Sequence, residues 1–336
     1  MAALSDQLLV VAILAYLVAM ICHAAEFAFG TRGVAARAAV RPARELVTVG
    51  AGGADGADGA ATPAGADDAP DRADAAAPVD RPGRGAIAGR IAAIVTVVAA
   101  VLHLAVITTR GIAADRMPWG NMYEFVLSGT FVGVAVWLFL LFRRPAVRHL
   151  GLFVALAMVL LLGVAGLILY TPVVPLIPAL NSYWFIIHIS TITVSSGIFV
   201  LGAVPAAMYL IRSGYEQGKR SFPYTLGRRA PAAAELERLT FRLHTFSFPI
   251  WTFAVMAGAV WAEAAWGRYW GWDPKETWAF ISWVVYAGYL HARLTPSVKR
   301  SVATWIALLG FLTMLVNLFG VNFFAGDSLH SYAGTD

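Results

Sequence analysis

Residues 266–278, with the sequence WGRYWGWDPKETW, have the residue types best suited to bind a flat apolar ligand. Four tryptophans and a tyrosine fall within these 13 positions, together with two glycines and two cations. Tryptophan and tyrosine also anchor helix ends at the headgroup level of a bilayer, but such a belt spreads over many helix ends and needs no glycines or cations. The cluster therefore predicts an aromatic shelf, formed by Trp266, Trp270 and Trp272, at the outer edge of a membrane.

Histidine is the residue type in this chain best able to ligate a metal, with seven histidines against a single cysteine. His188 and His330 are predicted to lie on the same side of the membrane as the aromatic shelf. Each histidine alone is more often a hydrogen-bonded structural residue. On a shared side with the shelf, the pair can supply two axial nitrogen ligands to a haem iron.

Three further histidines fall within predicted membrane helices, where ionisable groups usually face a site or an internal cavity. His291 ends one helix near the cytoplasm and is a candidate ligand for a second haem. His244 and His103 are weaker candidates, and no ligand role is assigned to them.

Two short patterns predict how the outer loops join their helices. Asp273 and Glu276 flank a proline and form the pattern of a helix N-cap with a capping box. Asp273 is thus expected to position the loop rather than to touch a ligand. Asn121 and Glu124 predict the same kind of helix start, and Trp119 just before them adds a second outer aromatic position.

The composition shows which elements must position these residues. Of the 336 residues, 59% are hydrophobic and 13% are charged, with a mean hydropathy of +0.68; soluble domains carry roughly 45–50% apolar and about 25% charged residues. A membrane-spanning helix needs about 20 mostly apolar residues. The chain is therefore expected to be an all-α, polytopic membrane helix bundle with about eight spans, at 7–29, 86–109, 122–142, 149–170, 183–211, 243–264, 276–293 and 301–320.

The basic residues predict the orientation of these spans. Of the 25 Lys and Arg residues, 21 belong to one alternate set of loops and helix ends, which should be cytoplasmic. Both termini and the 265–278 loop are then extracytoplasmic. The net charge of +5 follows from these arginines, and no motif points to nucleic acid.

The predicted domain organisation has three parts. Residues 1–30 form the first transmembrane helix, and 31–85 form a disordered cytoplasmic linker rich in Ala, Gly, Asp and Pro. Residues 86–336 form the membrane domain that contains the aromatic loop. The single Cys22 excludes a disulfide framework or a cysteine zinc site within the chain.

Five segments together resemble a known family. The segment WGRYWGWDPKETWAF resembles the WWD motif of the haem-handling proteins of cytochrome c maturation. The segments PWGNMYEF, NSYWFIIHI, YLHAR and GVNFFAGDSLHSYAG are similar to other recurrent segments of that family, in the expected order, between about residues 86 and 334. The chain as a whole resembles the CcsA/ResC component of system II, in its actinobacterial version, often called CcsB.

The resemblance implies how haem b is handled. The WWD loop binds haem on the outer face of the plasma membrane, with His188 and His330 as axial ligands to iron, while His291 binds a second haem inside the membrane. Trp119, Trp266, Trp270, Trp272 and Asp273 belong to the expected haem-binding set. Arg268, also in this set, or Lys275 would pair with the haem propionates.

The resemblance also implies a reaction and partners. The chain would be the membrane subunit of a holocytochrome c synthase, which attaches haem to the Cys-x-x-Cys-His segment of apocytochrome c through thioether bonds. A ResB/Ccs-type partner would supply the large outer domain and the second ligand of the membrane haem. Thiol-reducing proteins of the maturation pathway would keep the substrate cysteines reduced.

Other functional classes stay open at this point. A b-type cytochrome subunit for electron transfer would hold haem permanently, usually between paired histidines inside the bilayer. A haem exporter would carry haem across the membrane, and a solute transporter would need no haem. Purification would distinguish these classes. Exchangeable haem is expected for a protein that presents haem, tightly held haem for an electron-transfer subunit, and no haem for a solute transporter.

Overall fold

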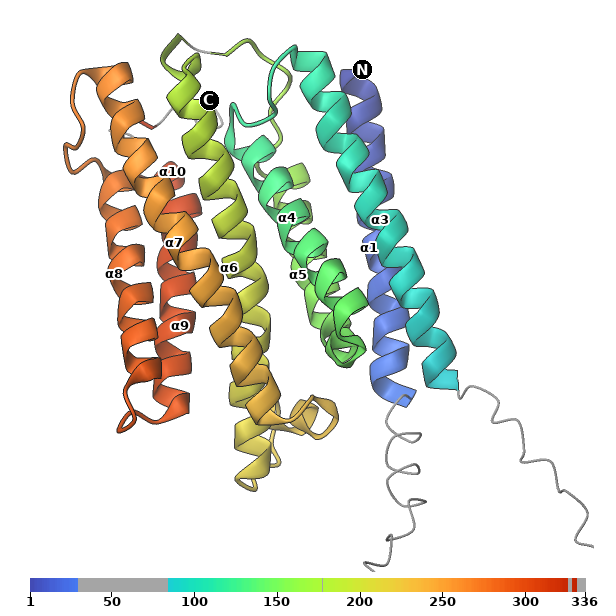
Figure 1. The fold of residues 1–336 in the computed structure, drawn as a ribbon. Coiled ribbons are helices and arrows are strands. Elements are labelled where there is room, and N and C mark those ends of the chain that lie inside the picture. The colour runs from blue at the N-terminus through green and yellow to red at the C-terminus, as the bar shows by residue number, and fades with distance from the viewer. Residues whose placement is uncertain (30–83, 177, 326–327, 331–336) are drawn as a thin grey trace, which may run out of the picture.

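The computed structural model describes residues 1–29, 84–176, 178–325 and 328–330, and within these ranges the chain is helical with no strand. The long helices run side by side as one bundle (Figure 1). Their bounds are Ala2–Phe29 (α1), Arg84–Ala114 (α3), Met122–Arg143 (α4), Gly151–Leu167 (α5), Tyr183–Glu216 (α6), Ala233–Trp266 (α7), Pro274–Leu294 (α8), Arg300–Leu315 (α9) and Val321–Phe324 (α10). Short 3₁₀ segments cover Pro145–Leu150 (η1), Pro178–Leu180 (η2) and Tyr224–Arg229 (η3), and a π-helical turn covers Val316–Gly320 (η4).

The all-α polytopic bundle is confirmed, with one difference in the number of spans. Seven helical segments in the described residues are long and apolar enough to cross a membrane, whereas eight were predicted. The segment that does not qualify is α8, predicted as 276–293. It forms a helix of 21 residues that packs against α7 and α9, but its tryptophans, tyrosines and charged ends lower its mean hydropathy.

Several helices extend beyond their predicted bounds. The helix α7 begins at Ala233, ten residues before the predicted start at 243. Its first turns are rich in charged residues, which is why they were excluded from the predicted span. They are held by the packing of Leu236 against Met208 and by an ion pair between Glu237 and Arg293 of α8.

The aromatic loop is shorter than the predicted 265–278. The helix α7 ends at Trp266, Gly267 follows in the left-handed conformation with φ of 71°, and α8 begins at Pro274. A glycine that closes a helix in this conformation avoids the steric cost that a side chain would meet. Of the predicted linker at 31–85, only the last two residues are described, and these begin α3; the rest lies outside the described residues.

The two ends of the bundle differ in charge. The segment between α7 and α8 lies at the same end as the start of α1 and the end of α10 (Figure 1). Arg143 at the end of α4, η3 and the segment between α8 and α9 lie at the opposite end, which carries most of the basic residues described. This arrangement agrees with the alternation of basic-rich and basic-poor loops from which the topology was predicted. Which end faces the cytoplasm stays a prediction.

Candidate functional site

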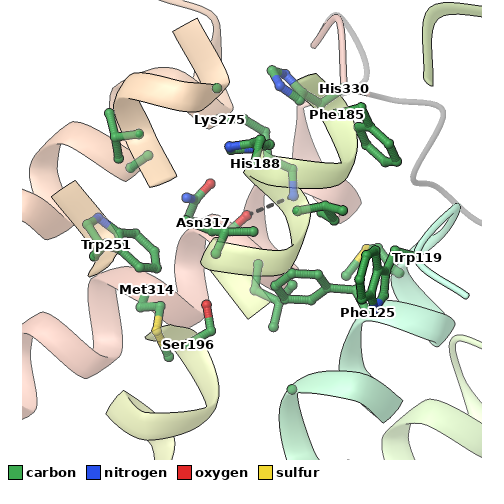
Figure 2. Close-up of a pocket in the computed structure, with 18 of the residues that line it drawn as sticks. Trp119, Phe125, Phe185, His188, Ser196, Trp251, Lys275, Met314, Asn317 and His330 are labelled. Atoms are coloured by element: carbon green, nitrogen blue, oxygen red, sulfur yellow. Dashed lines mark hydrogen bonds between the residues drawn. The ribbon is translucent and has the colours of Figure 1, made fainter. Parts of the chain in front are cut away.

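A cavity of about 200 Å³ opens among the helices near the end of the bundle that carries the aromatic loop (Figure 2). Side chains of α4, α6, α7, α8 and α9 line it, together with the loop and His330. Most of the lining is aliphatic or aromatic. A volume below the roughly 300–1,000 Å³ of typical small-molecule sites means that a porphyrin would have to widen the cavity or leave one edge outside it.

His188 of α6 points into this cavity with a defined tautomer. Its Nδ1 lies 2.8 Å from the carbonyl oxygen of Ala254 on α7, and since a carbonyl only accepts, Nδ1 carries the proton and Nε2 the lone pair. The ring also stacks on Trp261, at 5.8 Å between centroids and 10° between planes. A backbone hydrogen bond of this kind orients a histidine for metal binding.

The close approach of α6 to α7 at this point depends on Gly258. A methyl group added there would lie 2.7 Å from the His188 ring. The glycine therefore leaves the space that the imidazole occupies.

His330 reaches the same cavity from the segment after α10, and Asp273 holds it there. Its Nδ1 lies 3.0 Å from Oδ1 of Asp273, so this nitrogen donates and the coordinating lone pair of the neutral ring belongs to Nε2. Asp273 also accepts hydrogen bonds from the Ser328 hydroxyl at 2.9 Å and the Leu329 backbone N–H at 2.7 Å. The carboxylate thus ties the C-terminal segment to the start of α8.

The same carboxylate also caps α8. Asp273 accepts from the backbone N–H of Lys275, and Glu276 reaches back to the backbone N–H of Asp273, which confirms the predicted capping box. Burial alone would raise the pKa of Asp273, but the hydrogen bond and the charge interaction with His330, together with the hydrogen bonds from Leu329 and Lys275, outweigh it and hold the pKa well below its usual range.

The predicted shelf tryptophans have three different surroundings. Trp270 lines the cavity. Trp266 packs edge-on against His330, with 4.9 Å between ring centroids, and so supports the histidine. Trp272 is 65% exposed with a positive φ of 58°, and it contacts Trp270 at 5.7 Å. The structure therefore brings only one of the three to the cavity wall.

Trp119 lines the cavity from the opposite side, on a loop fixed by buried charges. Its indole N–H donates to the Ser128 hydroxyl at 3.1 Å. Glu124, fully buried, pairs with Arg110 at 3.0 Å and with Arg116 at 2.7 Å. It also accepts from the backbone N–H of Gly120 at 2.8 Å, so one carboxylate holds both ends of the loop.

Arg268 forms an ion pair with Glu276, with 3.2 Å between Nη1 and Oε1. It does not belong to the lining residues. Arg268 and Lys275 were predicted as alternative partners of a ligand carboxylate. The structure distinguishes them, because Lys275 lines the cavity and Arg268 does not.

The remaining candidate histidines lie away from the cavity. His291 is exposed near the end of α8, at the opposite end of the bundle. His244 is buried beside Phe199 and Tyr286, with Nδ1 2.8 Å from the Thr240 carbonyl. His103 is buried against α1 and α4, so the structure does not place a second histidine beside His291.

Sequence reasoning missed four residues that shape the site: Trp261, Gly258, Ala254 and Asn317. Three belong to the apolar run of α7, where nothing in the local sequence separates a cavity wall from a lipid-facing surface. Asn317 belongs to the π-helical turn η4, where an asparagine within an apolar segment is a signal that could have been used.

Together the elements form a multi-pass membrane bundle with a mostly apolar, partly aromatic cavity that two histidines line. Two histidines in such surroundings can ligate the metal of a planar apolar ring that widens the cavity or extends beyond it.

Sequence comparison agrees with this class. The profile of a family described as "Cytochrome C assembly protein" matches residues 119–327. The chain is 34% identical over 253 residues to the cytochrome c biogenesis protein CcsA of Guillardia theta, with 70% of this chain and 83% of the relative covered. It is 32% identical to the protein of that name from Trieres chinensis, covering 73% and 86%, and 31% identical to that from Gloeobacter violaceus, covering 67% and 81%. The chain belongs to the cytochrome c assembly family and is of the CcsA type.

Proposed function

We propose that the chain presents haem b at the outer face of the membrane for covalent attachment to apocytochrome c. Membership of the family gives it a role in cytochrome c maturation. The observation that carries the finer proposal is that His188 and His330, 142 positions apart in a chain with few histidines, both line one aromatic cavity.

In both histidines, a hydrogen bond to the protein orients the ring for binding iron. Each has Nδ1 held by an acceptor of the protein, Ala254 in one case and Asp273 in the other. Bis-histidine ligation would keep iron six-coordinate and limit its oxidation until the substrate arrives. The tryptophans at the cavity would pack against the porphyrin faces and edges.

The attachment step requires no nucleophile from this chain. The two thiols of the substrate Cys-x-x-Cys-His segment add across the two vinyl groups of haem, each S–H giving one thioether bond and one new C–H bond. The substrate histidine would replace one axial ligand. The chain supplies positioning and control of the iron, as expected for a protein that handles a cofactor.

The second part of the proposal concerns His291. Its exposed side chain lies on the same helical stripe of α8 as Phe280 and Val284, which are also exposed. A ligand from another chain is thus able to approach it. We propose that His291 binds haem inside the membrane together with a ResB-type partner, which would also provide the large outer domain.

An absorption spectrum of the chain, co-expressed with such a partner, tests the proposal. The wild type should show a reduced low-spin haem that is weakened in His188→Ala and in His330→Ala. The variants His188→Gly and His330→Gly should lose cytochrome c maturation and regain part of it with added imidazole, which replaces the missing nitrogen. A stably expressed wild type without haem would contradict the proposal.

A b-type electron-transfer subunit is the competing function within the haem-binding class. It predicts tight, stoichiometric haem that survives purification, whereas presentation predicts partial occupancy and exchange with added haem. The placement of both cavity histidines at one end of the bundle favours presentation, because electron transfer across a bilayer usually uses paired histidines on facing helices within it.

A further inference from the structure

Lys275 places an amine inside a cavity that is otherwise mostly apolar. It occupies the first turn of α8, and its side chain reaches across to the carbonyl oxygen of Asn317, with 3.2 Å between Nζ and oxygen. Figure 2 shows this hydrogen bond in the same part of the cavity as His188. A long side chain in a first turn at the bundle end could extend to solvent, yet this one lines the cavity instead.

The neighbouring acidic groups are engaged elsewhere. Asp273 is bound by His330 and the C-terminal segment. Glu276 is bound by Arg268 and by two backbone N–H groups of the loop. The side-chain nitrogen of Lys275 therefore faces the cavity and donates a hydrogen bond to the backbone carbonyl of Asn317, and it retains donors for an anionic group.

A second polar group faces the same space. Asn317 lines the cavity from the π-helical turn η4, and its side-chain oxygen is buried without a hydrogen-bond partner among the described residues. This oxygen only accepts, so a carboxylate cannot satisfy it; a carboxylate would bind the NH2 group of Asn317 after the amide has turned to present it to the cavity. Turns of this type are rare in helices and frequently mark functional sites.

We propose that Lys275, assisted by Asn317, binds a propionate of the porphyrin and so fixes how haem is rotated about the axis between His188 and His330. This inference rests on the proposed function and goes beyond it, because it assigns the carboxylate anchor to Lys275 and not to Arg268. An ammonium binds a carboxylate by charge-assisted hydrogen bonds, and the amide of Asn317 can donate to its second oxygen once it turns.

The anchor has a consequence for the attachment step. The two propionates of haem b lie on one side of the ring and the two vinyl groups on the other. A propionate held at Lys275 would therefore place the vinyl groups at the opposite edge of the ring, away from Lys275 and Asn317.

The test compares haem with haem dimethyl ester, whose propionates carry no charge. The full chain, purified with any co-expressed partner and stripped of haem, is titrated with each compound and binding is followed by absorption. The wild type should bind haem roughly tenfold more tightly than the ester, or better, because a charge-assisted hydrogen bond is lost with the ester.

Three variants distinguish the effect of the Lys275 charge from a structural effect of replacing its side chain. Lys275→Met keeps the apolar stem, and Lys275→Gln keeps a donor for the Asn317 carbonyl; both should bind haem and ester with nearly equal affinity. Arg268→Gln should keep the wild-type preference for haem. A preference that survives in both Lys275 variants, or that disappears in Arg268→Gln alone, would overturn the assignment.

The same titration keeps this inference distinct from the proposed function. If the wild type binds haem and ester equally well, the propionate anchor is wrong while haem presentation stands. If the wild type binds neither compound, both the anchor and haem presentation are wrong.

Discussion

Asp273 accepts a hydrogen bond from Nδ1 of His330 at 3.0 Å, across 57 positions of sequence. The carboxylate is at once the N-cap of α8 and the acceptor for three groups of the C-terminal segment. It thereby couples the shape of the aromatic loop to the position of a candidate iron ligand. A carboxylate behind a ligating histidine also makes the imidazole more basic.

Replacing this carboxylate should weaken haem binding at the cavity. Asp273→Ala removes the acceptor of His330, and the loss of such an outer partner typically lowers metal affinity about 10- to 100-fold. Haem titration of the purified chain measures the effect. Ser328→Ala, which removes one hydrogen bond to the same carboxylate, is the matched control and should have a much smaller effect; equal losses in the two variants would contradict the role given to His330.

The pH dependence of this tether follows from the depressed pKa of Asp273. Burial opposes ionisation, but the hydrogen bonds to the carboxylate and its charge interaction with His330 prevail and lower the pKa. The ionised group stabilises the fold above its ordinary pKa of about 3.9, and this contribution is lost only as the pH falls through the lower folded value. Hydrogen-exchange protection of the Leu329 amide, which donates to Asp273, should thus be the same at pH 7 and pH 5. Protection that disappears between these values would show that the carboxylate is not held ionised.

Gly258→Ala should displace His188. The added methyl group would lie 2.7 Å from the imidazole, closer than real contacts allow, and would push the ring off the Ala254 carbonyl and the face of Trp261. Haem affinity should fall at least about tenfold, in line with the loss of an orienting partner. Gly163→Ala is the control, since a methyl group at that position meets nothing within 4 Å. Normal haem binding by Gly258→Ala would argue against His188 as a ligand in this position.

Glu124→Gln should destabilise the bundle. Glu124 and Arg110 are almost completely buried, and removing one partner of a buried ion pair typically costs about 3–5 kcal/mol because the other charge stays unpaired. Thermal unfolding in detergent measures the change. Glu216→Gln breaks the more exposed pair with Arg212 and should cost less than about 1 kcal/mol. Comparable shifts in the two variants would mean that the buried cluster contributes little.

The sequence predicted best what depends on local chemistry. The helix starts at Asn121 and Asp273 were predictable because a capping side chain satisfies backbone groups within three residues. Long apolar runs likewise predicted most membrane helices, because length and hydropathy together determine a span. The start of α7 was missed, since its charged first turns are stabilised by residues distant in sequence.

Side-chain direction was the part that the sequence could not provide. Trp266, Trp270 and Trp272 share one motif, yet one lines the cavity, one packs on His330 and one is exposed. The difference arises from the backbone of the loop, where Trp272 has a positive φ. For the same reason, Arg268 and Lys275 were equivalent as loop cations and became distinct only once their contacts were known.

The π-helical turn at Val316–Gly320 lets the last membrane helix hold an extra residue without changing which way its later side chains point. A turn closed by i→i+5 hydrogen bonds takes up one residue more than an α-helical turn, so one residue fewer there would restore ordinary winding and leave the chain after it in nearly the same rotational phase. One residue fewer in Arg300–Leu315 would instead rotate everything after it by about 100° and retract it by about 1.5 Å, and the segment that carries His330 would approach Asp273 from another direction. The turn therefore acts as a phase adjustment: single-residue deletions are expected to be far more harmful in the α-helix before the turn than in the turn itself, although both would leave a span of sufficient length.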